Sequence, residues 1–145
     1  MARPVVLALG SPVDIIRMHV TSTEVIVAND FVYDGATGYA YAMSSASSAS
    51  IFIGIALDSS ASGETDDIAV AQRALVVCDC ADASYYVGAG LKYSHTNAVS
   101  DDSSANTIAW CASNAASGAS RLKILVDVLK LGGSDGSNFE TYTAT

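Results

Sequence analysis

The chain has little charge, few aromatic side chains and few of the residue types that usually carry chemistry. Of its 145 residues only 15% are charged and 8% are aromatic, with two histidines, three cysteines and two prolines. Seven Lys and Arg stand against fifteen Asp and Glu, which gives a formal net charge of −8. An acidic chain lacks the basic surface that binds phosphate backbones, so nucleic acid is not expected as a partner.

Long apolar runs are also missing. No stretch approaches the roughly 18–20 apolar residues that a membrane-spanning helix needs, so no membrane partner is expected. The run Val5–Leu9 is shorter than the roughly 7–15 residues of a secretory signal core, and Gly10-Ser11-Pro12 interrupts it. This segment is therefore predicted to be an extended arm or first strand of a protein assembled in the cytoplasm.

The cysteines and carboxylates lack the spacing of metal sites. Cys78 and Cys80 form a C-x-C pair, whereas zinc sites use two to four intervening residues and further ligands. Asp66-Asp67 and Asp101-Asp102 are adjacent pairs without the Asp-x-Asn/Asp-x-Asn/Asp-Gly pattern of calcium loops. No metal and no cofactor are expected, and the cysteines are predicted to be small apolar residues in a reducing compartment.

Candidate catalytic groups are equally scarce. His19 and His95 are the only side chains that titrate near neutral pH without a shift, and neither adjoins a cysteine or a Gly-x-Ser-x-Gly turn. No nucleophile–base pair can be assembled from local sequence. The chain is therefore predicted not to be an enzyme, and no catalytic residue is assigned.

Short apolar or alternating runs separated by Gly, Asn, Asp and Ser predict an all-β protein, because helical periodicity is almost absent. The Ala/Ser-rich stretches 43–50 and 114–120 are predicted to be loops. The predicted strands are Ile15–Val20, Glu24–Val27, Phe31–Tyr33, Tyr39–Met43, Ile51–Leu57, Ile68–Val70, Ala74–Cys80, Leu91–Tyr93, Ile108–Cys111 and Leu122–Leu129.

An internal repeat organises these strands. Ile51–Val70 aligns with Asn106–Leu125 at an offset of 55 residues, and Asn29–Tyr33 aligns with Ala89–Tyr93 at an offset of 60. Each copy contains a strand of the type Ile-[Gly/Ala]-[Ile/Trp]-[Ala/Cys] followed by a Ser-Gly turn. Two copies together are predicted to close a β-barrel around a shared core.

The predicted architecture is a small β-barrel or sandwich built from two similar β-units. Residues 1–20 form an arm and first strand, residues 21–131 the barrel domain, and residues 132–145 a polar tail. The repeat-like halves cover about residues 29–70 and 89–125.

Five segments carry a resemblance to a known group of proteins: Asn29–Tyr33, Ile53–Leu57, Ser62–Glu64, Val87–Tyr93 and Ile124–Leu129. Over roughly residues 24–130 the chain resembles small β-rich phage proteins, encoded beside major capsid genes, that are regarded as capsid decoration or cement proteins. The resemblance implies a structural virion protein on the outer capsid surface. Such a protein stabilises the capsid by bridging neighbouring subunits.

The expected partners are the major capsid protein and further copies of this chain, with a homotrimer favoured. Val5, Val6 and Leu7 of the arm are candidate contact residues, because an extended arm can add a strand to an exposed sheet edge of a partner. Phe139 and Tyr142, the only large apolar groups of the tail, are the other candidates.

A carbohydrate-binding or adhesin-like β-module on a virion or cell surface is the alternative. It would use a stacking platform formed by tyrosines. Tyrosines are also frequent in protein interfaces and cores, and that interpretation is favoured here. The five residues concerned are Tyr39, Tyr41, Tyr85, Tyr86 and Tyr93.

Overall fold

The structure is a computed structural model that describes residues 3–10, 14–44, 51–95, 97–101 and 107–128. Every element assigned in these residues is a β-strand, which confirms the all-β prediction. The strands are β1 (Val5–Leu9), β2 (Ile15–Met18), β3 (Phe31–Ala36), β4 (Tyr39–Ala42), β5 (Phe52–Ala56), β6 (Ile68–Ala71), β7 (Arg73–Cys80), β8 (Gly90–His95), β9 (Ala98–Asp101), β10 (Thr107–Cys111) and β11 (Arg121–Asp127).

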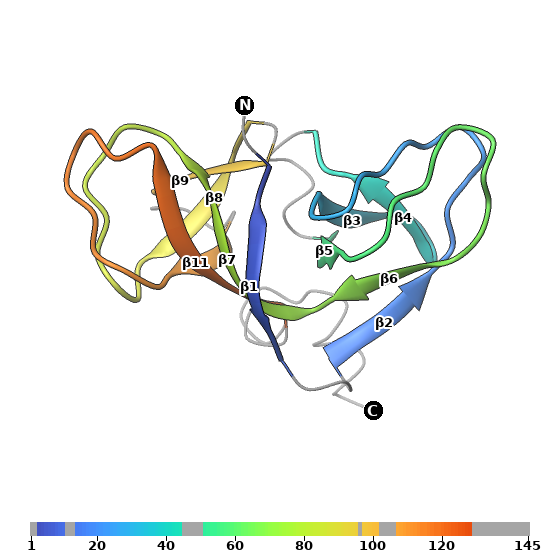
Figure 1. The fold of residues 1–145 in the computed structure, drawn as a ribbon, viewed down its shortest axis with the longest axis horizontal. Coiled ribbons are helices and arrows are strands. Elements are labelled where there is room, and N and C mark those ends of the chain that lie inside the picture. Colours follow the sequence, from blue (N-terminus) through green and yellow to red (C-terminus); the bar gives the residue numbers. More distant parts are fainter. Residues whose placement is uncertain (1–2, 11–13, 45–50, 96, 102–106, 129–145) are drawn as a thin grey trace.

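The strands form two sheets that lie side by side (Figure 1). We call strands β2–β6 the first unit, with order β2-β6-β5-β3-β4, and strands β7–β11 the second unit, with order β7-β11-β10-β8-β9. β7 also pairs with β9, so the second unit closes into a five-stranded barrel. In the first unit, a parallel bridge between His19 and Tyr39 joins the two outer strands. The prediction of two similar β-units is confirmed.

The pairing gives the residue equivalence between the units. Phe31 lies opposite Ile55 in the first unit, and Gly90 lies opposite Trp110 in the second. The offset of 55 therefore holds for β5 and β10. It is wrong for β6 and β11, which differ by 54 residues because Val70 lies opposite Ala56 and Ile124 opposite Cys111. β3 and β8 differ by 59 residues and not by the 60 of the sequence alignment. The one-residue error matters, because it would turn every side chain of that strand to the opposite face of the sheet.

Each unit has its own core, so the prediction of one barrel around a shared core is wrong. Val20, Ile26 and Val70 belong to the core of the first unit. The core of the second unit also takes in side chains of the first, among them Phe31, whose ring lies 6.5 Å from that of Tyr93. Five strands are enough to close the second unit because β7 and β9 meet directly.

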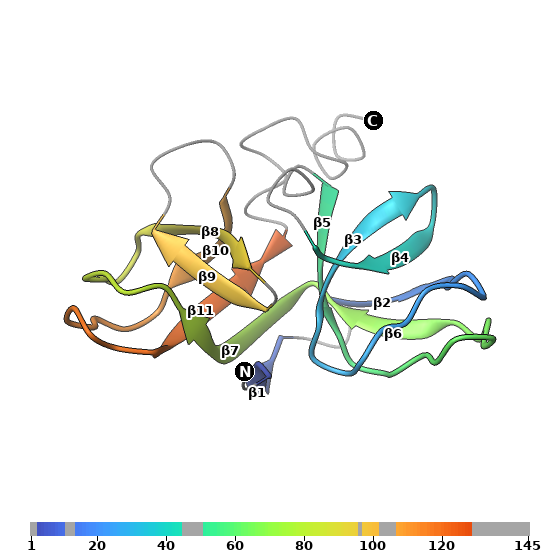
Figure 2. The same ribbon diagram turned by 90° about the horizontal axis from the view of Figure 1, so that it is seen from above.

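One continuous stretch of chain links the two units. β6 and β7 follow each other with only Gln72 between them, and Figure 2 shows them crossing from one unit to the other. β2 pairs antiparallel with β6, and β1 pairs antiparallel with β7. Gly10, directly after β1, continues this pairing, because its N–H donates to the Arg73 carbonyl over 3.0 Å. The predicted arm is therefore a strand of the protein's own sheet.

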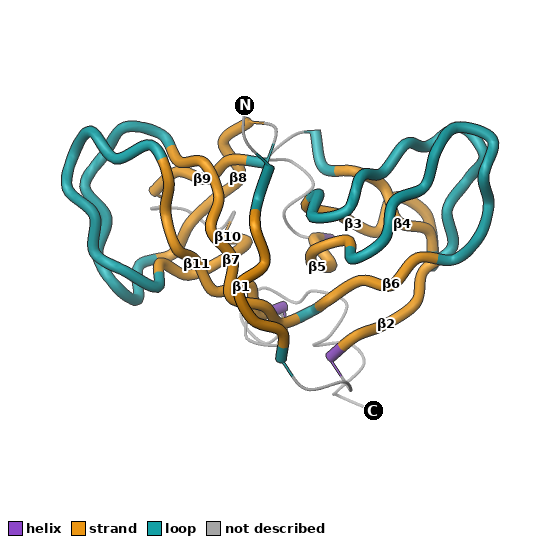
Figure 3. The backbone as a smooth tube through the Cα atoms, in the orientation of Figure 1, coloured by secondary structure: helices purple, strands orange, loops and turns teal. Residues whose placement is uncertain are grey.

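The strands differ from the prediction in two places. Glu24–Val27 is not a strand, since it makes only an isolated bridge between Ile26 and Ser60 within a long turn. β9 was not predicted, because Ala-Val-Ser-Asp has little strand propensity and is held by its neighbours β7 and β8. The predicted tail and residues 45–50 lie outside the described residues. Long turns occupy the two far ends of the molecule (Figure 3).

Candidate functional site

β1 presents large aliphatic side chains to solvent. Val5, Leu7 and Leu9 are 49%, 50% and 46% exposed, whereas Val6 packs against the core of the second unit. A shift in pairing between Val6 and Ala8 makes Leu7 the extra residue of a β-bulge. Of the predicted contact residues, Val5 and Leu7 thus lie on the surface and Val6 points inward. Phe139 and Tyr142 lie outside the described residues.

The start of β1 is fixed by a buried carboxylate at the seam between the units. Asp30 is 7% exposed and pairs with the Arg3 guanidinium. Its Oδ1 also accepts a hydrogen bond from Asn97 Nδ2 over 2.9 Å, and its Oδ2 accepts one from the Val27 N–H over 2.9 Å. Asn97 Oδ1 in turn accepts the Phe31 N–H over 3.1 Å. Asp30 thereby ties together the N-terminal segment, a turn of the first unit and the β8–β9 turn of the second.

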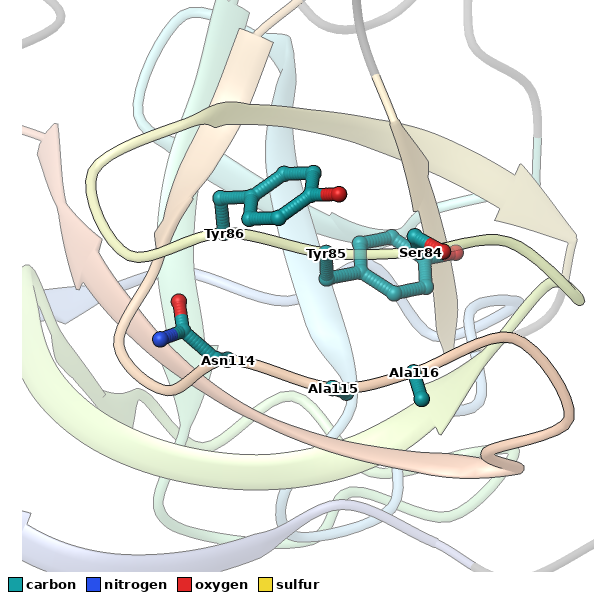
Figure 4. Close-up of a pocket in the computed structure, with 6 residues that line it drawn as sticks. All are labelled: Ser84, Tyr85, Tyr86, Asn114, Ala115 and Ala116. Atoms are coloured by element: carbon teal, nitrogen blue, oxygen red, sulfur yellow. The ribbon is translucent and has the colours of Figure 1, made fainter.

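Each unit has a shallow depression near its long turns. The bridges Ile26–Ser60 and Tyr85–Ala115 occupy equivalent places in the two units, but the depressions do not coincide. That of the first unit lies within the β5–β6 turn, and that of the second lies along the Tyr85–Ala115 bridge. The depression of the second unit is lined by Ser84, Tyr85, Tyr86, Asn114, Ala115 and Ala116 (Figure 4). That of the first unit is lined by Asp58, Ser59, Ser60, Glu64, Asp66, Asp67 and Ile68.

The five candidate tyrosines are divided between the two units and form no single platform in the described part of the chain. Tyr85 is buried, its hydroxyl donates to the Ala81 carbonyl over 2.6 Å, and burial raises its pKa to about 12. Tyr93 is also buried, and its hydroxyl donates to the Met43 carbonyl over 3.0 Å. Tyr86 is 67% exposed beside its depression. Tyr39 and Tyr41 belong to β4 of the first unit, where the ring of Tyr39 lies against His19 and that of Tyr41 lies 5.8 Å from the ring of Tyr33.

His19 has an acidic partner but no nucleophile. Its Nδ1 lies 2.6 Å from Asp67 Oδ1, on the surface of the first unit. Among the described residues no serine or cysteine is hydrogen-bonded to this imidazole. His95 belongs to β8, but its side chain lies outside the described part of the structure. The arrangement around His19 is an exposed hydrogen bond between an imidazole and a carboxylate.

The three cysteines are all free, and two are deeply buried. Burial raises the pKa of Cys78 to about 12 and also raises that of Cys80, so neither is a thiolate at neutral pH. In the described ranges, no group of three or more His, Cys, Asp or Glu side chains is arranged to hold a metal ion. Nor does any helix there have the length and apolar character needed to cross a bilayer.

No protein-family model matches the chain, and no curated protein matches it. Among solved structures, the chain is similar to the head fiber gp8.5 N base of bacteriophage phi29. The TM-score is 0.49 and the sequence identity 12%, over 79% of this chain and 95% of that chain. At this level of similarity, neither family membership nor function follows from the comparison.

Proposed function

We propose that the chain is a structural virion protein that decorates the outer surface of a phage capsid and stabilises it by bridging neighbouring capsid subunits. The observation that carries the proposal is the exposure of Val5, Leu7 and Leu9 within one five-residue strand. Single exposed aliphatic residues are ordinary, but several together mark a surface that binds another protein. The resemblance to capsid decoration proteins supplies the kind of partner.

The apolar surface continues from β1 onto the neighbouring strand. Val5 lies opposite Val77 and Ala8 lies opposite Leu75, and both residues of β7 are half-buried. Val5, Ala8, Leu75 and Val77 therefore share the outer face of the second unit, whereas the bulge at Leu7 places Leu9 opposite the buried Ala74. A face of this kind suits a partner with a fixed surface, such as an assembled shell, better than a small ligand that needs an enclosed cavity.

The net charge of −8 favours the outer surface of the capsid. An acidic protein is repelled by a DNA-filled interior and stays soluble before it binds. Several linked copies, with a trimer favoured, would strengthen attachment, since each bound copy raises the effective concentration of the next.

The carbohydrate-binding alternative has less support. It needs several exposed aromatic rings on one surface. Tyr85 and Tyr93 are buried, and Tyr86 lies in a different unit from Tyr39 and Tyr41, whose ring neighbours are His19 and Tyr33. In the depression of the second unit Tyr86 is the exposed ring, since the other tyrosine of its lining, Tyr85, is 1% exposed.

Co-sedimentation with expanded shells of the major capsid protein encoded alongside this chain tests the proposal. The variant Val5→Ser/Leu7→Ser/Leu9→Ser should bind shells about tenfold more weakly or worse, because it removes the apolar contact. The control Val25→Ser/Val87→Ser changes residues that are 52% and 63% exposed elsewhere, and should bind within about twofold of the original chain. Failure of the original chain to bind shells, together with saturable binding on a glycan array, would replace the proposal with the carbohydrate-binding function.

A further inference from the structure

β2 and β7 are equivalent strands, but only one of them has a neighbour on its outer edge. Ile15 lies opposite Ala71 in the first unit, as Leu75 lies opposite Leu125 in the second. β1 pairs with Ala74–Val77 along the outer edge of β7. The equivalent stretch of β2 has no strand beside it in the described residues, because its sheet begins with β2.

The free backbone groups on this edge can be identified from the end of the strand. The His19 N–H donates to the Gly38 carbonyl over 3.0 Å, and the His19 carbonyl accepts the Ala40 N–H over 2.8 Å. Backbone groups alternate in direction along a strand, so those of Arg17 and Ile15 point to the same outer side. Neither residue has a backbone partner on that side in the described part of the chain.

The burial of the side chains also indicates that the position beside β2 is unoccupied in the described part of the chain. Val76 is fully buried beneath its neighbours in the second unit, whereas its counterpart Ile16 is only partly buried. The pairing of β2 with β6 contains no bulge, in contrast to the bulge at Leu7 on β1. Bulges protect sheet edges from further pairing, so β2 offers the flatter and less protected edge.

We propose that the outer edge of β2 is a docking site for an extended apolar segment of a protein partner, which pairs antiparallel with Ile15–Arg17 as β1 pairs with Leu75–Val77. The inference deepens the proposed function, since the shell protein is the partner that would supply the segment. β1 shows which chemistry fits: five uncharged residues rich in Val and Leu.

Charge defines the segment further. Arg17 Nη2 donates to the Asp67 carbonyl over 2.8 Å, which places the edge beside Asp66 and Asp67 of the acidic depression. A segment flanked by basic residues would therefore be favoured and one flanked by acidic residues disfavoured.

A labelled peptide with the sequence of residues 3–9 followed by two lysines is the probe, measured by fluorescence anisotropy on the full chain. The peptide should bind saturably at β2, because β7 is already occupied by a tethered β1 at high effective concentration. Arg17→Pro removes the outward N–H, and edge strands tolerate proline, so binding should weaken about tenfold or more. Arg17→Ala keeps the N–H and removes a positive charge beside the lysines of the peptide, so its binding should not fall below that of the original chain.

A second probe leaves the protein unchanged. The same peptide with alternate N-methylated residues cannot form the backbone ladder, and its affinity should fall about tenfold or more. Equal binding of the methylated peptide, or equal loss with Arg17→Ala and Arg17→Pro, would overturn the proposal, as would absence of saturable binding. If the chain binds the peptide at β2 but does not bind capsid shells, the docking site is supported and the proposed function is refuted.

Discussion

The two units share a strand order and a pairing register, yet they present different edges and different ends to their surroundings. β1 covers the outer edge of β7, whereas the equivalent edge of β2 has no such neighbour in the described chain. The shared features are those fixed by backbone pairing. The features that differ concern what each unit can contact, so binding properties have to be sought in the differences.

Charge separates the units as clearly as the edges do. Residues 15–71 contain seven Asp and Glu against one Arg, whereas residues 73–127 contain five Asp against four Lys and Arg. The depression of the first unit is lined by four carboxylates, and that of the second by two tyrosines and alanines. The two ends of the molecule are therefore suited to different surroundings, with the more neutral second unit the better candidate for an apolar contact.

Deleting residues 1–9 should have the largest effect on the comparison. The second unit would lose the partner of its outer edge, the packing of Val6 and the ion pair of Arg3 with Asp30. We expect a loss of unfolding free energy on the order of 4 kcal/mol, measured by urea denaturation. Hydrogen exchange should show the loss of protection at Leu75 and Val77 with little change in β5. Equal loss of protection in both units would contradict the pairing of β1 with β7 of the second unit.

Gly54→Ala should come next, because this glycine has no room for a side chain. Its φ is 147°, and a Cβ there would lie 2.1 Å from the Ala71 carbonyl oxygen. The equivalent residue of the second unit is Ala109, which is fully buried. We expect Gly54→Ala to cost about 3 kcal/mol and Ala109→Gly about 1 kcal/mol in thermal unfolding. Each substitution gives one unit the residue that the other unit has at this position. Similar costs for the two would contradict a closer approach of the backbone to Gly54 than to Ala109.

Asp30→Ala tests the seam between the units. The substitution leaves the Asn97 amide and the Val27 N–H without their acceptor in a buried place, which should cost about 2–3 kcal/mol. Asp66→Ala, in the acidic depression, is the matched control and should stay within about 0.5 kcal/mol. Chemical denaturation of both variants gives the comparison, and a cost for Asp30→Ala no larger than the control would refute the role of this carboxylate.

Gly88 should give the smallest effect. Its φ is 91°, and its counterpart Asn29 has a φ of 77°, so both units place a left-handed residue at the same turn. Nothing lies within 4 Å of a Cβ on Gly88, so Gly88→Ala adds backbone strain alone, about 1 kcal/mol. Gly88→Asn should cost less than Gly88→Ala in the same thermal measurement, because asparagine tolerates this conformation. The opposite order would break the equivalence of the two turns.

The sequence predicts the β class and the two-unit plan because both rest on local patterns. Alternating apolar residues and Gly or Asn turns mark most of the strands, and the similarity of Ile53–Ala56 to Ile108–Cys111 marks the repeat at its correct offset. The offset between β3 and β8 was misjudged by one residue, because Phe31 and Leu91 are both large and apolar. Only the pairing with β5 and β10 shows that Phe31 corresponds to Gly90.

Long-range contacts account for what the sequence could not show. Asp30 and Asn97 are 67 residues apart, and neither type is unusual in a turn, so their hydrogen bond has no local signal. β1 was recognised as extended, but its pairing with the second unit, and not with the neighbouring β2, depends on the continuity of β6 and β7. The difference between the outer edges of β7 and β2 follows from that pairing, so the sequence did not predict it either.

Amide hydrogen exchange at four residues of the free chain tests the central contrast most directly. Val77 and Leu75 should be strongly protected by β1, while the amides of Arg17 and Ile15 should exchange at nearly the rate of open backbone. Addition of the peptide of residues 3–9 with two lysines should then slow exchange at Arg17 and Ile15. Strong protection of Arg17 and Ile15 in the free monomer would show that the edge of β2 is already covered and would contradict the account.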